Sequence, residues 1–126
     1  MFNRKMAKFR PRHTPGKMNK TEEDYSLVLQ AEKDAEEIHD FMFEPIKLKL
    51  ADLCYYSPDF MVLSNDGFIE FHEVKGTKSN GKILAEEKAI VKIKTAAEQF
   101  WMFKFKIVGK LSKKNGGGWM ERKFNW

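Results

Sequence analysis

The sequence has very little cysteine and no long apolar run. Its single cysteine, Cys54, excludes an internal disulfide, and one Cys with three scattered His residues lacks the spacing of a zinc site. No apolar run approaches the ~18–20 residues of a membrane span. No apolar segment follows the basic start at residues 1–5, so we expect no signal peptide. These absences favour a protein of the reducing cytoplasm that does not enter the membrane.

Positive charge is unevenly distributed along the chain. Residues 1–20 carry seven of the 23 Lys and Arg residues and no acid, which leaves 16 basic against 18 acidic residues in the remainder. This segment contains two prolines and no hydrophobic period, as is typical of a flexible arm. A second basic zone runs from Lys104 to Lys123, where Glu121 is the only acid. Such segments suit a polyanion such as nucleic acid, although a solubilising tail has the same composition.

Hydrophobic periodicity predicts two helices, at about residues 21–39 and 83–100. Thr21 is the expected N-cap of the first helix, because acidic residues follow it in the first turn. Alternation of apolar and polar residues predicts four strands, at residues 41–50, 55–63, 68–75 and 102–108. Pro45 places the first of these strands at a sheet edge or at a bulge. Residues 119–126 are expected to form either a short last strand or a loose end.

The chain has the length of one domain, and we divide it into three parts. These are a basic flexible arm at residues 1–20, a folded domain at residues 21–110 and a Gly-rich basic extension at residues 111–126. The turn signal Asn65-Asp66-Gly67 makes the second and third strands antiparallel, and the helix crossing makes the third and fourth strands parallel. The expected fold is mixed α/β (α+β), with a mixed central sheet flanked by helices.

Charged side chains are expected to meet across this hairpin. Asp59 and Glu73 both lie seven residues from Asp66 at the turn centre, so they become cross-strand partners with Cβ atoms about 5 Å apart. Alternation puts Lys75 on the face of Glu73 and turns His72 to the opposite layer, where packing is expected. Two close carboxylates repel, and a bound Mg²⁺ or Mn²⁺ relieves that repulsion. A lysine beside such a metal can orient water, so the group suits phosphodiester hydrolysis.

The same segments resemble the PD-(D/E)XK nuclease superfamily. The resemblance is carried by Ser57-Pro58-Asp59-Phe60 followed by His72-Glu73-Val74-Lys75-Gly76. The order of elements is similar to that superfamily's αβββαβ restriction-endonuclease-like core. Over residues 19–108 the chain resembles small phage-encoded members related to RecB-like nucleases and Holliday-junction resolvases. Further matching segments are Asn19-Lys20-Thr21-Glu22, Tyr55-Tyr56 and Lys92-Ile93-Lys94.

The resemblance implies a role for each matching residue. Asp59, Glu73 and the backbone carbonyl of Val74 would ligate Mg²⁺ or Mn²⁺, and Lys75 would activate or position the attacking water. Glu22 would add a ligand directly or through water, unless it only stabilises its helix while Glu23 takes the role. Nucleic-acid contacts are expected from a set of basic residues whose alternative is ordinary surface charge: Lys92, Lys88, Lys78, Lys82, Arg10, Arg12 and Lys17.

The function that the resemblance implies is a metal-dependent DNA endonuclease. Its favoured form is a structure-selective enzyme that cuts branched phage DNA, such as a Holliday junction, in the host cytoplasm. A symmetric homodimer would suit that substrate, because it places two sites on two strands. One alternative is a non-catalytic basic nucleic-acid-binding protein, and a third interpretation is a small partner protein whose Phe and Trp surface docks on a larger assembly.

Overall fold

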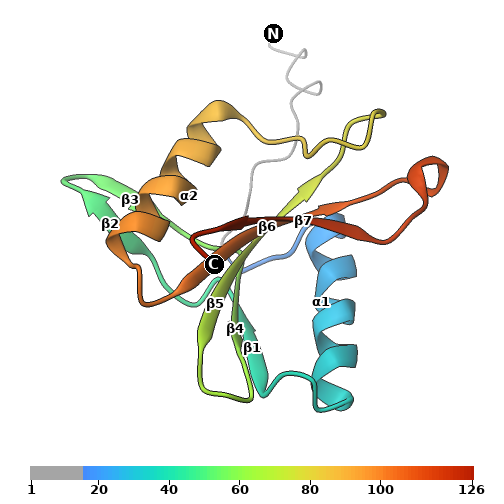
Figure 1. The fold of residues 1–126 in the computed structure, drawn as a ribbon, viewed down its shortest axis with the longest axis horizontal. Coiled ribbons are helices and arrows are strands. Elements are labelled where there is room, and N and C mark those ends of the chain that lie inside the picture. The colour runs from blue at the N-terminus through green and yellow to red at the C-terminus, as the bar shows by residue number, and fades with distance from the viewer. Residues whose placement is uncertain (1–15) are drawn as a thin grey trace, which may run out of the picture.

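A mixed five-stranded sheet forms the centre of the fold (Figure 1). The computed structural model describes residues 16–126. The strand order across the sheet is β1-β4-β5-β6-β7, with β1 at Asp40–Phe43, β4 at Phe60–Leu63, β5 at Ile69–Gly76, β6 at Lys104–Lys110 and β7 at Trp119–Phe124. Helix α1 (Lys20–Asp34) covers one face, and helix α2 (Glu87–Gln99) covers the other. A small second sheet, β2 (Leu48–Ala51) and β3 (Cys54–Tyr56), lies beside α2, and a short 3-10 helix, η2 (Lys113–Asn115), precedes β7.

The mixed α/β fold class is confirmed. Without the β2–β3 hairpin and β7, the order of elements is the predicted α-β-β-β-α-β. Strands β4 and β5 pair antiparallel through the Asn65-Asp66-Gly67 turn, and β5 and β6 pair parallel across α2. Both relations follow from the predicted connections, since a tight turn reverses the chain and a helix crossing returns it in the same direction.

Two hydrophobic cores lie on the two faces of this sheet, and β5 contributes to both. On the α2 side, Phe71 packs with Ile93 and with the hairpin residues Leu48 and Leu50. On the α1 side, Val74 packs with a cluster that includes Tyr25, Leu29 and Phe60. Because strand residues alternate between faces, β5 presents different chemistry to each layer.

The first helix begins and ends earlier than predicted. Its N-cap is Asn19 rather than Thr21: the Asn19 side chain accepts the Glu22 N–H at 2.8 Å, and the Glu22 carboxylate accepts the Asn19 N–H at 2.9 Å. This reciprocal pair is a capping box, which satisfies two N–H groups at once. The helix ends at Asp34, and Glu36 has a φ of 61°. Acidic side chains are unfavourable at a helix C-terminus, which explains why the predicted end at residue 39 was wrong.

Prolines divide the two segments that were predicted as long strands. Residues 41–50 form β1 and β2, which belong to different sheets on either side of Pro45. Residues 55–63 are likewise split at Pro58 into β3 and β4. A proline donates no N–H to a strand ladder, so each segment is interrupted at its proline, and β1 lies at the sheet edge that Pro45 predicted as one alternative. The second helix begins at Glu87 rather than residue 83, because Ile83 pairs with Thr77 in an isolated bridge.

The C-terminal segment adds an edge strand to the sheet. Strand β7 pairs antiparallel with β6, so the residues predicted as an extension, 111–126, contain part of the folded unit. Trp119 packs edge-on against Tyr25 with ring centroids 5.0 Å apart, and the Trp126 indole N–H donates to the Phe105 carbonyl at 2.7 Å. Of the predicted arm, residues 16–20 lead directly into α1 and the remainder lies outside the described residues. No helix within residues 16–126 is long and apolar enough to span a bilayer.

We expect Gly109→Ala to destabilise the protein by about 1–3 kcal/mol, the usual cost of overpacking. A Cβ at Gly109 would lie 3.0 Å from side-chain carbons of both Ile83 and Thr77 and 3.3 Å from the Met120 Cγ. The matched control is Gly76→Ala on the neighbouring strand, where nothing lies within 4 Å of the added Cβ. Urea denaturation of both variants measures the difference, and equal stabilities would contradict the close packing at Gly109.

Candidate active site

Asp59 lies where β4 and β5 separate. The last pair of these strands is Phe60 opposite His72, and the same register continued by one residue sets Asp59 opposite Glu73, as predicted. Asp59 itself precedes the first residue of β4, and its Oδ2 accepts the Val74 backbone N–H at 2.8 Å. The carboxylate thus replaces the partner that a longer strand would have supplied. The side chain is buried, with the residue 9% exposed.

Glu73 projects from β5 toward the α2 layer and makes two polar contacts. The buried Tyr56 hydroxyl, from β3, donates to the Glu73 Oε1 at 2.8 Å. The Lys75 ammonium lies 3.6 Å from the Glu73 Oε2. The prediction that Glu73 and Lys75 share a face is therefore confirmed. The contact with Tyr56 was not predicted, because β3 was expected to be part of a single long strand with β4.

A third carboxylate, Glu22, reaches the same place from α1. Its side chain lies within hydrogen-bonding reach of Asp59 and is one of the charges that act on Glu73. The capping box with Asn19 holds it at the first turn of the helix, where it is only 4% exposed. Glu23, the alternative that the sequence left open, is exposed. Carboxylates from α1, from the turn before β4 and from β5 therefore converge at one end of the sheet.

Burial makes this convergence electrostatically costly. Burial and the charges of Glu73 and Glu22 raise the pKa of Asp59 to about 9, although the Val74 N–H opposes the shift. Burial also raises the pKa of Glu73, against the nearby Lys75 and the hydrogen bond from Tyr56. At neutral pH the Asp59–Glu73 pair therefore retains a proton unless additional positive charge enters the site.

The donor atoms at this site fit a hard divalent cation. Carboxylate oxygens of Asp59, Glu73 and Glu22 are the ligand type that Mg²⁺ and Mn²⁺ prefer, and Mg²⁺ is commonly held by one or two carboxylates with water completing its shell. Among residues 16–126, no group of three or more His, Cys, Asp or Glu side chains is arranged so that it could hold a metal ion as it stands. The role of the Val74 carbonyl stays a prediction.

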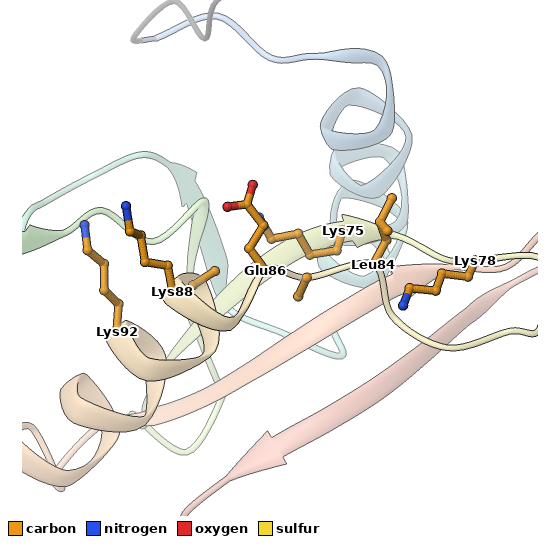
Figure 2. A pocket seen from close by; sticks show the side chains of 8 residues that line it. Lys75, Lys78, Leu84, Glu86, Lys88 and Lys92 are labelled. Atoms are coloured by element: carbon orange, nitrogen blue, oxygen red, sulfur yellow. The ribbon is translucent and has the colours of Figure 1, made fainter.

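A basic hollow lies between Lys75 on β5 and the start of α2 (Figure 2). It has a volume of about 580 Å³ and is lined by eight residues: Lys75, Lys78, Leu84, Ala85, Glu86, Lys88, Ala89 and Lys92. A smaller hollow of about 280 Å³ shares Ala89 and Lys92 with it and extends to Glu73, Tyr55, Tyr56 and Ser57. Four lysines therefore line the larger hollow, and the smaller hollow beside it reaches Glu73.

The predicted nucleic-acid-binding residues fall into three groups. Lys78, Lys88 and Lys92 line the basic hollow, and the Lys92 ammonium also donates to the Tyr55 carbonyl at 3.2 Å. Lys82 and Lys17 are exposed elsewhere and do not belong to the lining of that hollow. Arg10 and Arg12 lie outside the described residues. The structure thus brings three of the seven predicted residues next to the candidate site.

Comparisons of the chain with protein-family models, with curated proteins and with solved structures gave no match. The interpretation of the carboxylate cluster therefore depends on its own geometry, burial and charge.

We expect Asp59→Asn to stabilise the metal-free protein, and to do so increasingly as the pH rises. The pKa of Asp59 is raised from 3.8 to about 9 on folding. The stability that the folded protein gains by keeping Asp59 protonated is thus fully present below pH 4. That stability is lost as the pH rises toward 9. The asparagine can still accept the Val74 N–H. In EDTA, the Tm of Asp59→Asn should match the wild type near pH 4 and exceed it by several degrees near pH 8.

The matched control for this pH series is Asp66→Asn, which changes an exposed acid in the turn between β4 and β5. A constant difference between Asp59→Asn and the wild type from pH 4 to pH 9 would contradict the electrostatic cost assigned to Asp59.

Proposed function

We propose that this protein is a metal-dependent endonuclease that hydrolyses phosphodiester bonds of DNA. The observation that carries the proposal is the convergence of the buried Asp59 and Glu22 with the partly buried Glu73, which lies beside Lys75. Such a cluster is costly in an ordinary structural role, since buried like charges destabilise the fold. Clusters of acids with perturbed pKa values are more common at sites that bind metals or perform proton chemistry.

Each residue then has a task that its position supports. A bound Mg²⁺ or Mn²⁺ would neutralise charge on the phosphate and lower the pKa of a coordinated water. Lys75 lies beside Glu73 and can hydrogen-bond the attacking water. Tyr56 fixes one oxygen of Glu73, which keeps that carboxylate in a single orientation. Lys78, Lys88 and Lys92 supply positive charge along the hollow through which a phosphate backbone would pass.

Branched DNA is the substrate that we propose within this function. A four-way junction has two strands to be cut, and a symmetric homodimer would present two copies of the site to them. The test is a cleavage assay on duplex, nicked, flap and four-way-junction DNA, with an RNA duplex for comparison. The relative cleavage rates show which substrate the protein prefers. Sedimentation of the protein with and without junction DNA measures the oligomeric state.

A non-catalytic nucleic-acid-binding protein is the second candidate. It is favoured by the basic hollow alone, which attracts a phosphate backbone whether or not a metal is bound. It predicts binding that weakens with salt and no cleavage under any metal condition. The two candidates therefore differ in what happens to the DNA after binding.

We expect the wild type to cleave DNA with Mg²⁺ or Mn²⁺ and to be inactive in EDTA, and we expect Lys75→Ala to lower the cleavage rate at least about 100-fold. DNA affinity and the melting temperature should change little, because Lys75 is one of four lysines around the hollow and is partly exposed. Lys94→Ala, an exposed position on α2 outside the hollow, is the matched control. Full activity of Lys75→Ala would reject the mechanism.

We expect the double variant Lys78→Ala, Lys88→Ala to bind DNA more weakly, with the slope of log affinity against log salt reduced by roughly 2, about 1 for each phosphate that is no longer neutralised. Fluorescence anisotropy with a labelled duplex at several salt concentrations measures this slope. The control is Lys49→Ala with Lys94→Ala, which removes the same charge from exposed positions outside the hollow. An equal weakening in both double variants would mean that net charge, rather than the hollow, binds DNA.

A further inference from the structure

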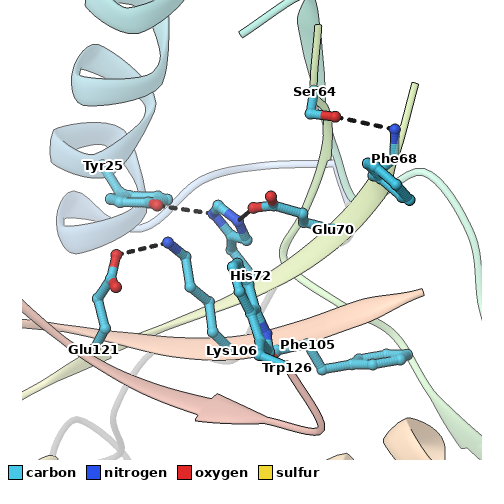
Figure 3. A network of polar contacts seen from close by, with 9 residues as sticks. All are labelled: Tyr25, Ser64, Phe68, Glu70, His72, Phe105, Lys106, Glu121 and Trp126. Carbon is cyan, nitrogen blue, oxygen red and sulfur yellow. Dashed lines mark hydrogen bonds and ion pairs between the residues drawn. The ribbon is translucent and has the colours of Figure 1, made fainter. Parts of the chain in front are cut away.

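Three buried or partly buried polar side chains connect α1 to β5 on the face of the sheet opposite α2 (Figure 3). The Tyr25 hydroxyl lies 2.8 Å from the His72 Nδ1, and the His72 Nε2 lies 2.9 Å from the Glu70 Oε1. Tyr25 and His72 are 5% and 3% exposed. The Tyr25–His72 hydrogen bond joins the N-terminal half of α1 to the strand that carries Glu73, so it connects two of the three elements that supply carboxylates to the candidate site.

Charge determines the direction of each hydrogen bond in this network. Burial works to raise the pKa of Glu70, but the hydrogen bond from His72 and the charges of Lys106 and Lys104 hold that pKa below its ordinary value. Glu70 is therefore an ionised carboxylate that accepts a hydrogen bond from the His72 Nε2–H. Burial lowers the pKa of His72, so the neutral ring keeps a lone pair on Nδ1. The Tyr25 hydroxyl donates to that lone pair, and burial raises the pKa of Tyr25, which keeps its proton in place.

Tyr25 lies on the same stripe of α1 as Glu22. The buried positions of this helix are Glu22, Tyr25 and Leu29, which recur at the spacing of one helix face. Apolar packing along such a stripe is non-directional and tolerates small slides and rotations of the helix. A hydrogen bond has a preferred length and angle, so the Tyr25–His72 hydrogen bond fixes the height and rotation of α1 against β5. One turn away, that placement determines where the Glu22 carboxylate meets Asp59.

We propose that Tyr25 and His72 are positioning residues, whose hydrogen bond holds Glu22 against Asp59 and so completes the oxygen ligands for a divalent ion. This inference rests on the proposed function, because it concerns the affinity of that site for its metal. Residues that orient metal ligands without touching the metal commonly change metal affinity by roughly 10–100-fold when they are replaced.

The test is Tyr25→Phe, which removes only the hydroxyl. The ring keeps its packing against Phe60 and Trp119, whose centroids lie 5.7 and 5.0 Å away. We expect Mn²⁺ binding, measured by calorimetry, to weaken about tenfold. The Mn²⁺ concentration for half-maximal DNA cleavage should rise by the same factor, with the rate at saturating Mn²⁺ within about threefold of the wild type. An unchanged Mn²⁺ affinity would overturn the proposal.

Two control variants separate positioning from general stability. Glu121→Gln alters the Lys106–Glu121 ion pair, which belongs to the same polar region but joins β6 to β7 rather than α1 to β5. Val28→Ala weakens the apolar packing of α1 and leaves the Tyr25 hydroxyl in place. Both should leave Mn²⁺ affinity unchanged at a temperature well below their melting points. A tenfold weakening in either control would mean that any loosening of the helix is sufficient, and would overturn the specific role of the hydroxyl.

Hydrogen exchange distinguishes failure of this inference from failure of the proposed function. If the wild type neither binds Mn²⁺ nor cleaves DNA, the proposed function and the ligand role of Glu22 are rejected. The positioning of α1 is then judged in the metal-free protein by the amides of Glu22 and Glu23, which donate to Asn19. Faster exchange of these amides in Tyr25→Phe, with the Phe105 amide unchanged, supports the positioning role, and unchanged exchange rejects it.

Discussion

The clustering of three carboxyl groups beside β5 is the constraint on which the rest of this structure depends. Asp59, Glu73 and Glu22 come from separate elements, so the fold must hold α1, the turn before β4 and β5 together against their repulsion. The two hydrophobic cores on either side of the sheet provide that cohesion. The Val74 N–H donates to Asp59 and the Tyr56 hydroxyl donates to Glu73. These hydrogen bonds lower the free-energy cost of burying each carboxylate without removing it.

The sequence was sufficient for the part of the site that depends on strand register. A tight turn fixes which residues stand opposite each other, and period-two alternation fixes which side chains share a face. Asp59, Glu73 and Lys75 follow from those two rules, and β4–β5 pairing has the predicted register. The burial of His72 on the face opposite Glu73, against Tyr25, follows from alternation as well.

Contacts between elements far apart in the chain could not be obtained in this way. Tyr56 reaches Glu73 because Pro58 diverts β3 out of the main sheet, and a propensity pattern does not say where a diverted strand will pack. The bond from Tyr25 to His72 spans 47 residues and depends on how α1 is rotated. The Asn19 cap was accessible in principle, since Asn followed three residues later by Glu is the spacing of a capping box, but the acids after Thr21 gave a competing signal.

The Val74–Asp59 hydrogen bond has a further consequence for the backbone of β5. Beyond its pairing with β4, which ends at His72, β5 has no neighbouring strand within residues 16–126 on that side to accept the Val74 N–H. The Asp59 side chain occupies the Val74 N–H on that edge. The residue at the centre of the candidate site therefore also completes the backbone hydrogen bonding of β5, so an apolar side chain at position 59 would leave the buried Val74 N–H without this partner.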